Sequence, residues 1–433
     1  MEELMTVSRN ELSWPRRSFL KTASLAGLLG IPFSRSQATA TPMKSLEGKA
    51  PDWVRTVRHQ IPATGQSLYF QHGGIGPSPK PVIEEVKRLL DFQNEGPADP
   101  RYVGALGKAE DSCRPLVAGA LGCQKEEVAL THNTTEALNI VIWSIDWKKG
   151  DEILTSSHEH PALRMPSYNL RDRLGVTHRL APIDIGEDVV DNVLSLLTPR
   201  TRLVAMSHVS RRNGRVMPVQ RLAQALRKKN VRLLLDGAQG AGNVPVEFNK
   251  MGCDYYAFCG HKWLLGPKGT GGLMIRKEIL EATPVSWTGA HSYLSLDDEG
   301  QYEWHPNGRR YEFGTRSQAV FGGFAEALRW LDHIGWDKIY QRISDLSGQA
   351  AQIVKESKKF ELVSPPDKES RSGVFVLKLP EGSSGLEVYN KLAEVDRILV
   401  SPLDKPRDLR VCLHFFNTME EFETLMARLD QYC

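Results

Sequence analysis

The feature that most constrains this chain is a stretch between residues 127 and 277 in which short apolar runs alternate with longer amphipathic segments. Strands that alternate with helices are joined by crossovers, which favour a largely parallel sheet with helices on its faces. The expected strands are Glu127–Leu130, Glu152–Thr155, Thr177–Ile183, Arg202–Val209, Val231–Leu235, Asp254–Cys259 and Gly272–Ile275. The expected helices include Thr135–Ser144, Ala162–Leu174, Val189–Leu197 and Val219–Lys229. The sequence therefore predicts an α/β fold on a mostly parallel seven-stranded sheet.

The rest of the 433-residue chain lies on either side of this unit. From Gly314 onward, a long helical pattern through Leu331 precedes two strand candidates, Ser372–Leu379 and Leu409–Phe415, which is typical of a smaller α+β domain. One large and one small domain suit this length. We predict an N-terminal arm over residues 41–75, a large domain over 76–313 and a small C-terminal domain over 314–433.

Residues 1–40 have the features of an export signal. Arg16-Arg17 stands directly before Ser-Phe-Leu-Lys, a weakly apolar run follows, and Ala38-Thr39-Ala40 has the form of a cleavage site. This segment resembles a twin-arginine signal, which implies export of the folded protein by the twin-arginine translocase to the periplasm. The apolar run falls short of the about 20 residues that a membrane span needs, so we expect no stable membrane anchor. A disordered tail with a chance arginine pair is the alternative.

Composition excludes some partners. The 55 Lys and Arg residues nearly balance 52 Asp and Glu residues, and the formal charge of +3 comes without a basic stripe, so nucleic acid is not an expected partner. The six cysteines lack paired metal-type spacing, so no metal site is predicted.

A glycine-rich stretch around Lys262 carries the strongest chemical signal. Residues 259–272 read C-G-H-K-W-L-L-G-P-K-G-T-G-G and directly follow an apolar strand. A lysine at the end of a buried strand, framed by glycines that let a ligand approach the backbone, is well placed to form a Schiff base with a carbonyl compound. Taken alone, a glycine-rich turn with a surface lysine is the more frequent arrangement.

Asp236 stands at the end of another apolar strand, V-R-L-L-L-D over residues 231–236. A carboxylate there is costly unless a cation pairs with it. The protonated pyridine nitrogen of a pyridoxal cofactor is such a cation, and the pair keeps the ring an electron sink. An aspartate that caps the following turn is the alternative.

Two further motifs follow strands. Asn133, Thr134 and Thr135 precede a helix, where hydroxyls and first-turn amides suit a phosphate, although plain helix capping is equally good chemistry. His160 follows the next strand, where its ring could lie flat on an aromatic ligand. These groups, Asp236 and Lys262 all fall beyond the carboxyl ends of expected strands, which is where open α/β sheets bind ligands.

Residues from about Tyr69 to Leu429 resemble the class V aminotransferases of pyridoxal 5′-phosphate (PLP) fold type I, a group with cysteine desulfurases, isopenicillin N epimerase-like proteins and selenocysteine lyases. The resemblance implies PLP as cofactor, with Lys262 forming the Schiff base, Asp236 pairing with the pyridinium and Gln239 bonding the ring oxygen. It further implies that His160 stacks on the ring. The phosphate would be held by Asn133, Thr134, Thr135 and His261.

The same resemblance implies a homodimer and a substrate site. Gly314-Thr315 resembles the segment that reaches a neighbouring subunit's phosphate. Arg410 would bind the substrate carboxylate through two hydrogen bonds, with a structural salt bridge as the alternative. Gly74 lies in a glycine turn, residues 69–76, that would stand near the substrate.

Two departures from the family pattern limit the reaction. Cysteine desulfurases carry a mobile cysteine shortly before the carboxylate-binding arginine, and residues 385–409 contain none; Cys412 follows Arg410 on an expected strand. Arg211 stands where desulfurases commonly carry asparagine. It could engage a second substrate carboxylate or alter the ring oxygen's proton affinity, and a solvated loop arginine is equally good.

The sequence thus predicts an exported PLP enzyme that acts at the α-carbon of an amino acid or amino-acid moiety. Transamination or a related oxidative or epimerising reaction is the first expectation, with tailoring of a peptide metabolite such as a siderophore as one setting. A C–S lyase acting on cysteine or selenocysteine without a persulfide cysteine is the second. A PLP-fold binding module without catalysis is the alternative of another class.

Overall fold

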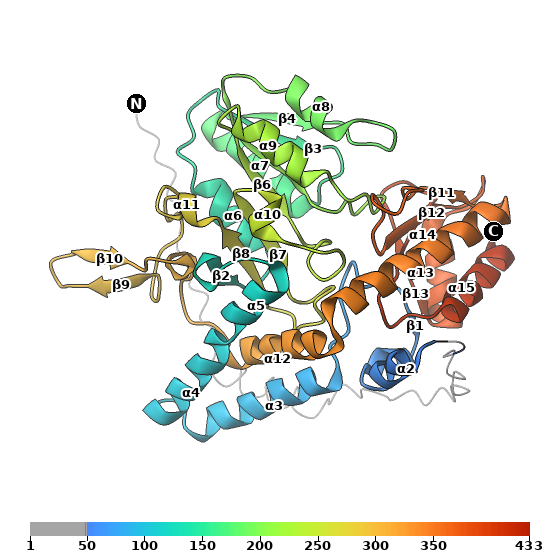
Figure 1. The fold of residues 1–433 in the computed structure, drawn as a ribbon, viewed down its shortest axis with the longest axis horizontal. Helices are drawn as coiled ribbons and strands as arrows, with labels where there is room; N and C mark the ends of the chain where they lie inside the picture. The colour runs from blue at the N-terminus through green and yellow to red at the C-terminus, as the bar shows by residue number, and fades with distance from the viewer. Residues whose placement is uncertain (1–47, 49) are drawn as a thin grey trace, which may run out of the picture. The chain divides into compact units, whose positions relative to one another are not determined.

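The computed structural model describes residue 48 and residues 50–433 (Figure 1). The predicted signal over residues 1–40 lies outside the described residues, as does the start of the predicted arm. Residues 45–433 group as one compact unit, and the predicted boundary near residue 314 stays a prediction. No helix of the described residues is long and apolar enough to cross a membrane.

A seven-stranded sheet forms the centre of the fold, in the order β2-β8-β7-β6-β5-β3-β4. Strand β8 is antiparallel to both of its neighbours, whereas the pairs from β7 to β4 are parallel. The predicted α/β class and the mostly parallel sheet are therefore confirmed. The strands are β2 (Val128–Thr131), β3 (Glu152–Ser156), β4 (Thr177–Ala181), β5 (Thr201–Ser207), β6 (Arg232–Asp236), β7 (Tyr255–Cys259) and β8 (Gly271–Ile275).

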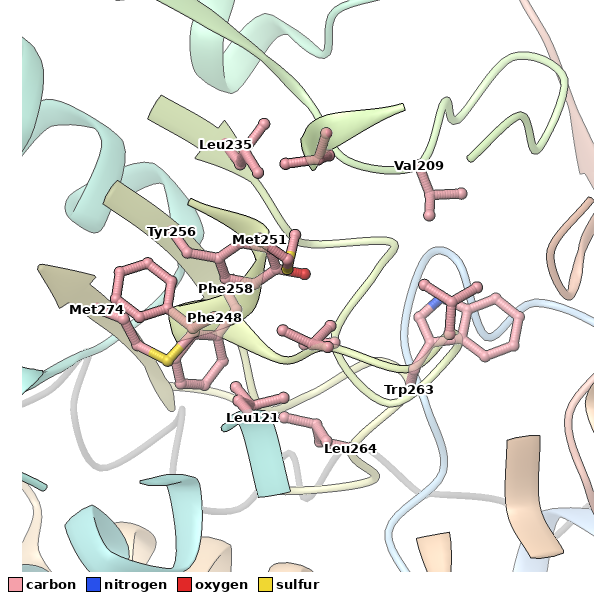
Figure 2. Packing of buried hydrophobic residues seen from close by; sticks show 14 of the residues in the cluster. Leu121, Val209, Leu235, Phe248, Met251, Tyr256, Phe258, Trp263, Leu264 and Met274 are labelled. Carbon is pink, nitrogen blue, oxygen red and sulfur yellow. The ribbon is translucent and has the colours of Figure 1, made fainter. Parts of the chain in front are cut away.

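Apolar side chains cover both faces of this sheet. Along β5, Val204 and Met206 join one buried cluster, whereas Leu203 and Ala205 join another. Successive residues of a strand point to opposite faces, so the two clusters are the two sides of the sheet. Figure 2 shows part of the first cluster, in which Tyr256, Phe258 and Met274 pack near one another.

Helices follow the strands in alternation, and local signals set their ends. Asn133 caps α6 by accepting a hydrogen bond from the Glu136 amide, and Asp188 caps α8 in the same way. Gly175 ends α7 in the left-handed conformation that glycine adopts readily. The helices in this region are α6 (Thr134–Trp143), α7 (Pro161–Leu174), α8 (Val189–Ser195), α9 (Val219–Arg227), α10 (Phe248–Met251) and α11 (Lys277–Leu280), with the 3₁₀ turns η2 (Lys125–Glu127) and η3 (Gly308–Tyr311).

A second, four-stranded antiparallel sheet forms near the C-terminus, in the order β11-β12-β15-β14. Helix α13 contacts strand β11 of this sheet and buries Ile343, Leu346 and Ala350. The strands are β11 (Glu361–Leu362), β12 (Val374–Lys378), β14 (Ser401–Pro402) and β15 (Asp408–Cys412). The helices are α13 (Trp336–Ser357), α14 (Gly385–Lys391) with the π-helical turn η4 (Leu392–Asp396), and α15 (Met419–Tyr432).

The described N-terminal residues pack onto this C-terminal region. Strand β1 (Leu68–Tyr69) pairs in parallel with β13 (Ile398–Leu399). Helix α2 (Asp52–His59) carries Arg58, whose buried guanidinium contacts Glu421 of α15 at 2.6 Å. A 3₁₀ turn, η1 (Pro62–Gly65), connects α2 to β1.

Helix α12 (Gln318–Ile334) runs beside three helices from the first half of the chain (Figure 1). These are α3 (Lys80–Glu95), α4 (Pro100–Asp111) and α5 (Cys113–Leu121). A hairpin of β9 (Tyr293–Leu296) and β10 (Tyr302–Trp304) projects from the body, with Leu294, Leu296 and Tyr302 more than half exposed.

Candidate active site

One cavity of about 420 Å³ lies where the parallel strands end, an edge of the sheet that we call the carboxyl edge. It lies between this edge and the four-stranded sheet, because Arg410 of β15 also lines it. The predicted residues that line it are Gly74, Asn133, Thr134, Thr135, His160, Arg211, Asp236, Gln239, His261, Lys262 and Arg410. Thr315 does not line it; this residue is exposed in a loop before α12.

The N-terminus of α6 supplies the donors predicted for a phosphate. The Asn133 side-chain oxygen caps the helix by accepting a hydrogen bond from the Glu136 amide, so the alternative of plain helix capping holds for this residue. The hydroxyl groups of the threonines that follow are still available for a phosphate. Among the described residues, the Thr134 hydroxyl and His261 Nδ1 are buried without a hydrogen-bond partner of normal geometry, and the Cys259 thiol and the Thr270 backbone lie near them. Because buried polar atoms are nearly always satisfied, these orphaned groups fit an anionic ligand at the positive end of the helix.

Asp236 ends β6 with its side chain buried. Its Oδ1 accepts a hydrogen bond from the Ala238 amide at 2.9 Å, and burial raises the pKa of this carboxyl while the nearby Lys262 charge lowers it. A buried carboxylate with one backbone donor still favours a cation. The site therefore fits a protonated ring nitrogen at Asp236.

Lys262 lies three residues beyond the end of β7 and is partly buried in the cavity wall. The backbone of the glycine turn runs directly against it: the Gly76 amide donates to the His261 carbonyl at 2.7 Å, and a Cβ at Gly76 would lie 1.9 Å from the Lys262 carbonyl oxygen. Gly76 is thus required by a close approach of two loops. This contact fixes the backbone from which the lysine amine enters the cavity.

His160 caps α7, since its Nδ1 accepts a hydrogen bond from the Ala162 amide at 3.1 Å. Desolvation in the cavity, together with the charges of Lys262, Arg211 and Arg410, lowers the pKa of His160 to about 4. The imidazole is therefore neutral near pH 7, with its proton on Nε2. A neutral ring suits stacking on an aromatic cofactor.

Gln239 is held at both ends of its amide. Nε2 donates to the Gly73 carbonyl at 2.7 Å, and Oε1 accepts from Trp263 Nε1 at 2.9 Å. One amide hydrogen of Nε2 remains for a ligand. The contact to a ring oxygen stays a prediction.

Glu159 is the buried group that sequence reasoning missed. It accepts hydrogen bonds from Ser156 and from both the amide and the hydroxyl of Ser207, at 3.0 and 2.6 Å for the latter two. Burial, with a contribution from nearby Asp236, raises the pKa of Glu159 to about 7. A glutamate directly before His160, just past an apolar strand, was the signal that could have found it.

All six cysteines are free thiols. Cys412 is buried on β15, where its sulfur accepts a hydrogen bond from the Gly73 amide at 3.3 Å and burial raises the pKa of the thiol. Among the residues that the structure describes, no group of three or more His, Cys, Asp or Glu side chains could hold a metal ion.

The class V aminotransferase profile matches residues 68–425, so this chain belongs to the class V aminotransferase family. It is 30% identical to isopenicillin N epimerase of Amycolatopsis lactamdurans over 86% of this chain and 97% of that protein. A probable cysteine desulfurase of Pyrococcus abyssi is 27% identical over 87% of this chain and 96% of that protein.

Solved structures of the cystine C–S lyase C-DES are also similar. One holds glycine covalently linked to the PLP cofactor; it superimposes with a TM-score of 0.82 at 28% identity, covering 87% of this chain and 99% of that chain. Another holds the reaction product cysteine persulfide, with the same TM-score and identity over 86% of this chain and 100% of that chain. The fold is thus PLP fold type I, the protein is a PLP-dependent enzyme, and the predictions of family, enzyme class and cofactor are confirmed.

Proposed function

We propose that this enzyme breaks a bond at the α-carbon of an amino acid or amino-acid moiety, by transamination or by related epimerising or oxidative chemistry. The observation that supports it is the shared cavity of Lys262, which follows β7, Asp236, which ends β6, and Arg410 of β15 in the other sheet. Bound PLP supplies an electron sink for the α-carbon. Tailoring of a peptide metabolite such as a siderophore stays a prediction within this proposal.

Each residue has a defined task in the proposal. Arg410 binds the substrate carboxylate and so orients the α-carbon. Lys262 removes or returns the α-proton at its amine, which lies in the same cavity. Asp236 stabilises positive charge on the ring side of the site, and neutral His160 covers the ring face without adding charge.

Cleavage of a carbon–sulfur bond without a persulfide cysteine is the second candidate. Cys412 is fully buried and held by the Gly73 amide, which argues against a mobile nucleophile. The similar C-DES is described as a cystine C–S lyase. Release of sulfur products from cystine or cysteine would favour this candidate.

Absorbance and product analysis test the proposal together. Protein loaded with PLP should be yellow, and its band should shift when a substrate amine is added, whereas Lys262→Ala should lack the band. Keto acid, ammonia, sulfide and chirality then separate the reactions. A wild-type protein that stays colourless after loading would support the non-catalytic binding module instead.

We also propose a homodimer in which Thr315 reaches the partner's phosphate site. Thr315 is exposed and outside its own chain's cavity, and the β9–β10 hairpin carries exposed apolar side chains. Mixed dimers of a Lys262→Ala chain and a Thr315→Ala chain should regain activity if sites are shared, because one of their two sites then has both residues intact. A monomer in solution would contradict the proposal.

For localisation, we propose export to the periplasm by the twin-arginine translocase. The support is the sequence around Arg16 and Arg17. Replacing both with lysine should leave the protein in the cytoplasm, and unchanged export would refute this route.

A further inference from the structure

The guanidinium groups of Arg211 and Arg410 line the same cavity, and the Arg410 charge acts on Arg211. Arg410 enters from β15 of the four-stranded sheet, and Arg211 enters from the loop after β5 of the seven-stranded sheet. Burial lowers the pKa of Arg211, and the charges of Arg410, Arg212 and Arg164 lower it further, against the opposing effect of Asp404. Like charges held together in a partly desolvated site call for an anion.

Among the residues that the structure describes, Asp404 is the carboxylate that pairs with Arg211 and Arg212. Asp404 Oδ2 contacts Arg211 Nη2 at 3.0 Å and Arg212 Nη2 at 2.9 Å, and the Asp404 side chain is 54% exposed. Within the described residues, no carboxylate lies within salt-bridge distance of Arg410, whose Nη2 donates to the Ser401 hydroxyl at 3.0 Å. Three guanidinium groups against one carboxylate leave an excess of positive charge.

Spare donors remain on both arginines. The Nε atoms of Arg211 and Arg410 are buried without a partner. Arg410 is 8% exposed, so its charge is nearly removed from water. A buried guanidinium with unused donors matches the forked geometry of a carboxylate.

The cofactor's phosphate does not balance Arg211. The predicted phosphate donors follow β2, which is separated from β5 by β8, β7 and β6. Four strand spacings separate the axes of β2 and β5 by roughly 19 Å. The phosphate therefore does not neutralise Arg211, and its charge is left for the cofactor's ring oxygen or for an acidic group of the substrate.

We propose that the substrate carries two acidic groups, with its α-carboxylate on Arg410 and a second carboxylate on Arg211. This inference rests on the proposed function, because it assigns the α-carboxylate of an amino-acid substrate. The substrate class is then a dicarboxylic amino acid, or an amino-acid moiety whose side chain ends in an acid.

The test uses ligands that cannot form a covalent bond through an amine. Succinate, glutarate and adipate are compared with their monoamides by calorimetric titration of the cofactor-loaded full chain. At least one diacid should bind about tenfold more tightly than its monoamide, as expected for one charge-assisted contact. Equal binding across the whole series would overturn the inference.

Two variants locate the second acid site. Arg211→Gln should abolish the preference for the diacid, whereas Arg212→Gln, which loses a contact with the same Asp404, should keep it. A preference kept in Arg211→Gln, or lost equally in Arg212→Gln, would contradict the assignment. If a variant fails to fold, the wild-type series still decides.

The two proposals fail in different ways. Absence of the lysine-bound cofactor band would refute the proposed function, and comparison of unloaded wild type with unloaded Arg211→Gln would still report a diacid preference that depends on Arg211. A normal band with no preference for diacids would refute only the substrate class.

Discussion

The two edges of the seven-stranded sheet treat buried charge in opposite ways. At the amino edge, where the parallel strands begin, Asp254 accepts hydrogen bonds from Arg232 at 3.1 Å, from Arg276 at 2.8 Å and from the Leu233 amide at 2.8 Å. At the carboxyl edge, Asp236 accepts one from a backbone amide, in the part of the chain that the structure describes. The protein neutralises its charges at one edge and leaves them for a ligand at the other.

Cavity size alone points to the wrong edge. A larger cavity of about 690 Å³ lies at the amino edge, with Asp146, Arg202 and Lys229 in its wall. It exceeds the 420 Å³ of the carboxyl edge. Incomplete pairing of buried groups, rather than volume, therefore identifies the site.

The largest expected contrast is between the two aspartates. Asp236→Asn should lower kcat/KM about a thousandfold, because the ring loses the carboxylate that stabilises its proton; that factor is about 4 kcal/mol. The cofactor-free variant should unfold at the same or a higher temperature than wild type, since a buried charge without a cation is removed.

Asp254→Asn is the matched control for that contrast. Loss of its buried pairs with Arg232 and Arg276 should lower the free energy of unfolding by about 3 kcal/mol, with activity per folded molecule unchanged. Denaturant titration and steady-state kinetics measure both quantities. The contrast between the edges would be wrong if Asp254→Asn lost activity and Asp236→Asn lost stability.

Glu152, the first residue of β3, and Glu159, three residues after β3, should differ in the pH dependence of stability. Glu159 has a pKa of about 7, above its ordinary 4.5, so the stability it contributes is present below about pH 4.5 and is lost as the pH rises through 7. The groups that face it are Ser156, Ser207 and Asp236. Stability of Glu159→Gln relative to wild type should therefore rise by roughly 3 kcal/mol between pH 4.5 and 8.

Glu152 should show the opposite sign. Burial raises the pKa of this carboxyl, but hydrogen bonds from Arg179, Thr198 and Thr201 outweigh it and leave the pKa below 4.5. Its contribution is present above pH 4.5 and is lost as the pH falls, so the stability of Glu152→Gln relative to wild type should fall as the pH rises toward 4.5. Urea titrations across pH test both signs, and parallel curves for the two variants would contradict them.

Arginine-to-lysine changes should separate the edges by substrate affinity. Arg410→Lys should raise the KM of the amino-acid substrate about a hundredfold, because an ammonium cannot make the two parallel hydrogen bonds of a guanidinium. Arg232→Lys at the amino edge should leave KM unchanged. Initial-rate kinetics check this, and an unchanged KM in Arg410→Lys would leave Arg410 a structural residue.

The smallest contrast concerns two buried threonines. Thr134→Val should raise the dissociation constant of PLP about tenfold without loss of stability, since its hydroxyl has no partner of normal hydrogen-bond geometry among the described side chains and backbone groups. Thr201→Val should leave PLP binding unchanged and cost about 1 kcal/mol of stability, because its hydroxyl donates to Glu152 at 3.0 Å. Fluorescence titration of PLP and thermal unfolding measure the pair.

The sequence predicted the sheet well because its strands are buried on both faces and therefore stand out as apolar runs. It also predicted Lys262, Asp236 and His160 at one edge, since parallel strands end on the same side. It could not predict that Asp254 pairs with two arginines whereas Asp236 pairs with none of the described arginines, because this depends on which strands become neighbours. Glu159 was missed for the same reason: its partner Ser207 lies 48 residues further along the chain.

Other contacts depend on how the two sheets meet. Asp404 reaches Arg211 across 193 residues of sequence, so the charge of Arg211 could not be assessed from its own loop. The proposed role of Thr315 is another case, since a role in a partner's site would leave no trace inside one chain.

The attachment points of the cavity have a mechanical consequence. Lys262 follows a strand of the seven-stranded sheet, and Arg410 belongs to the four-stranded sheet. A ligand that binds both residues therefore connects the two sheets and restricts their relative motion. Occupancy should then slow amide hydrogen exchange in β14 and β15, which lie more than a hundred residues from Lys262 along the chain.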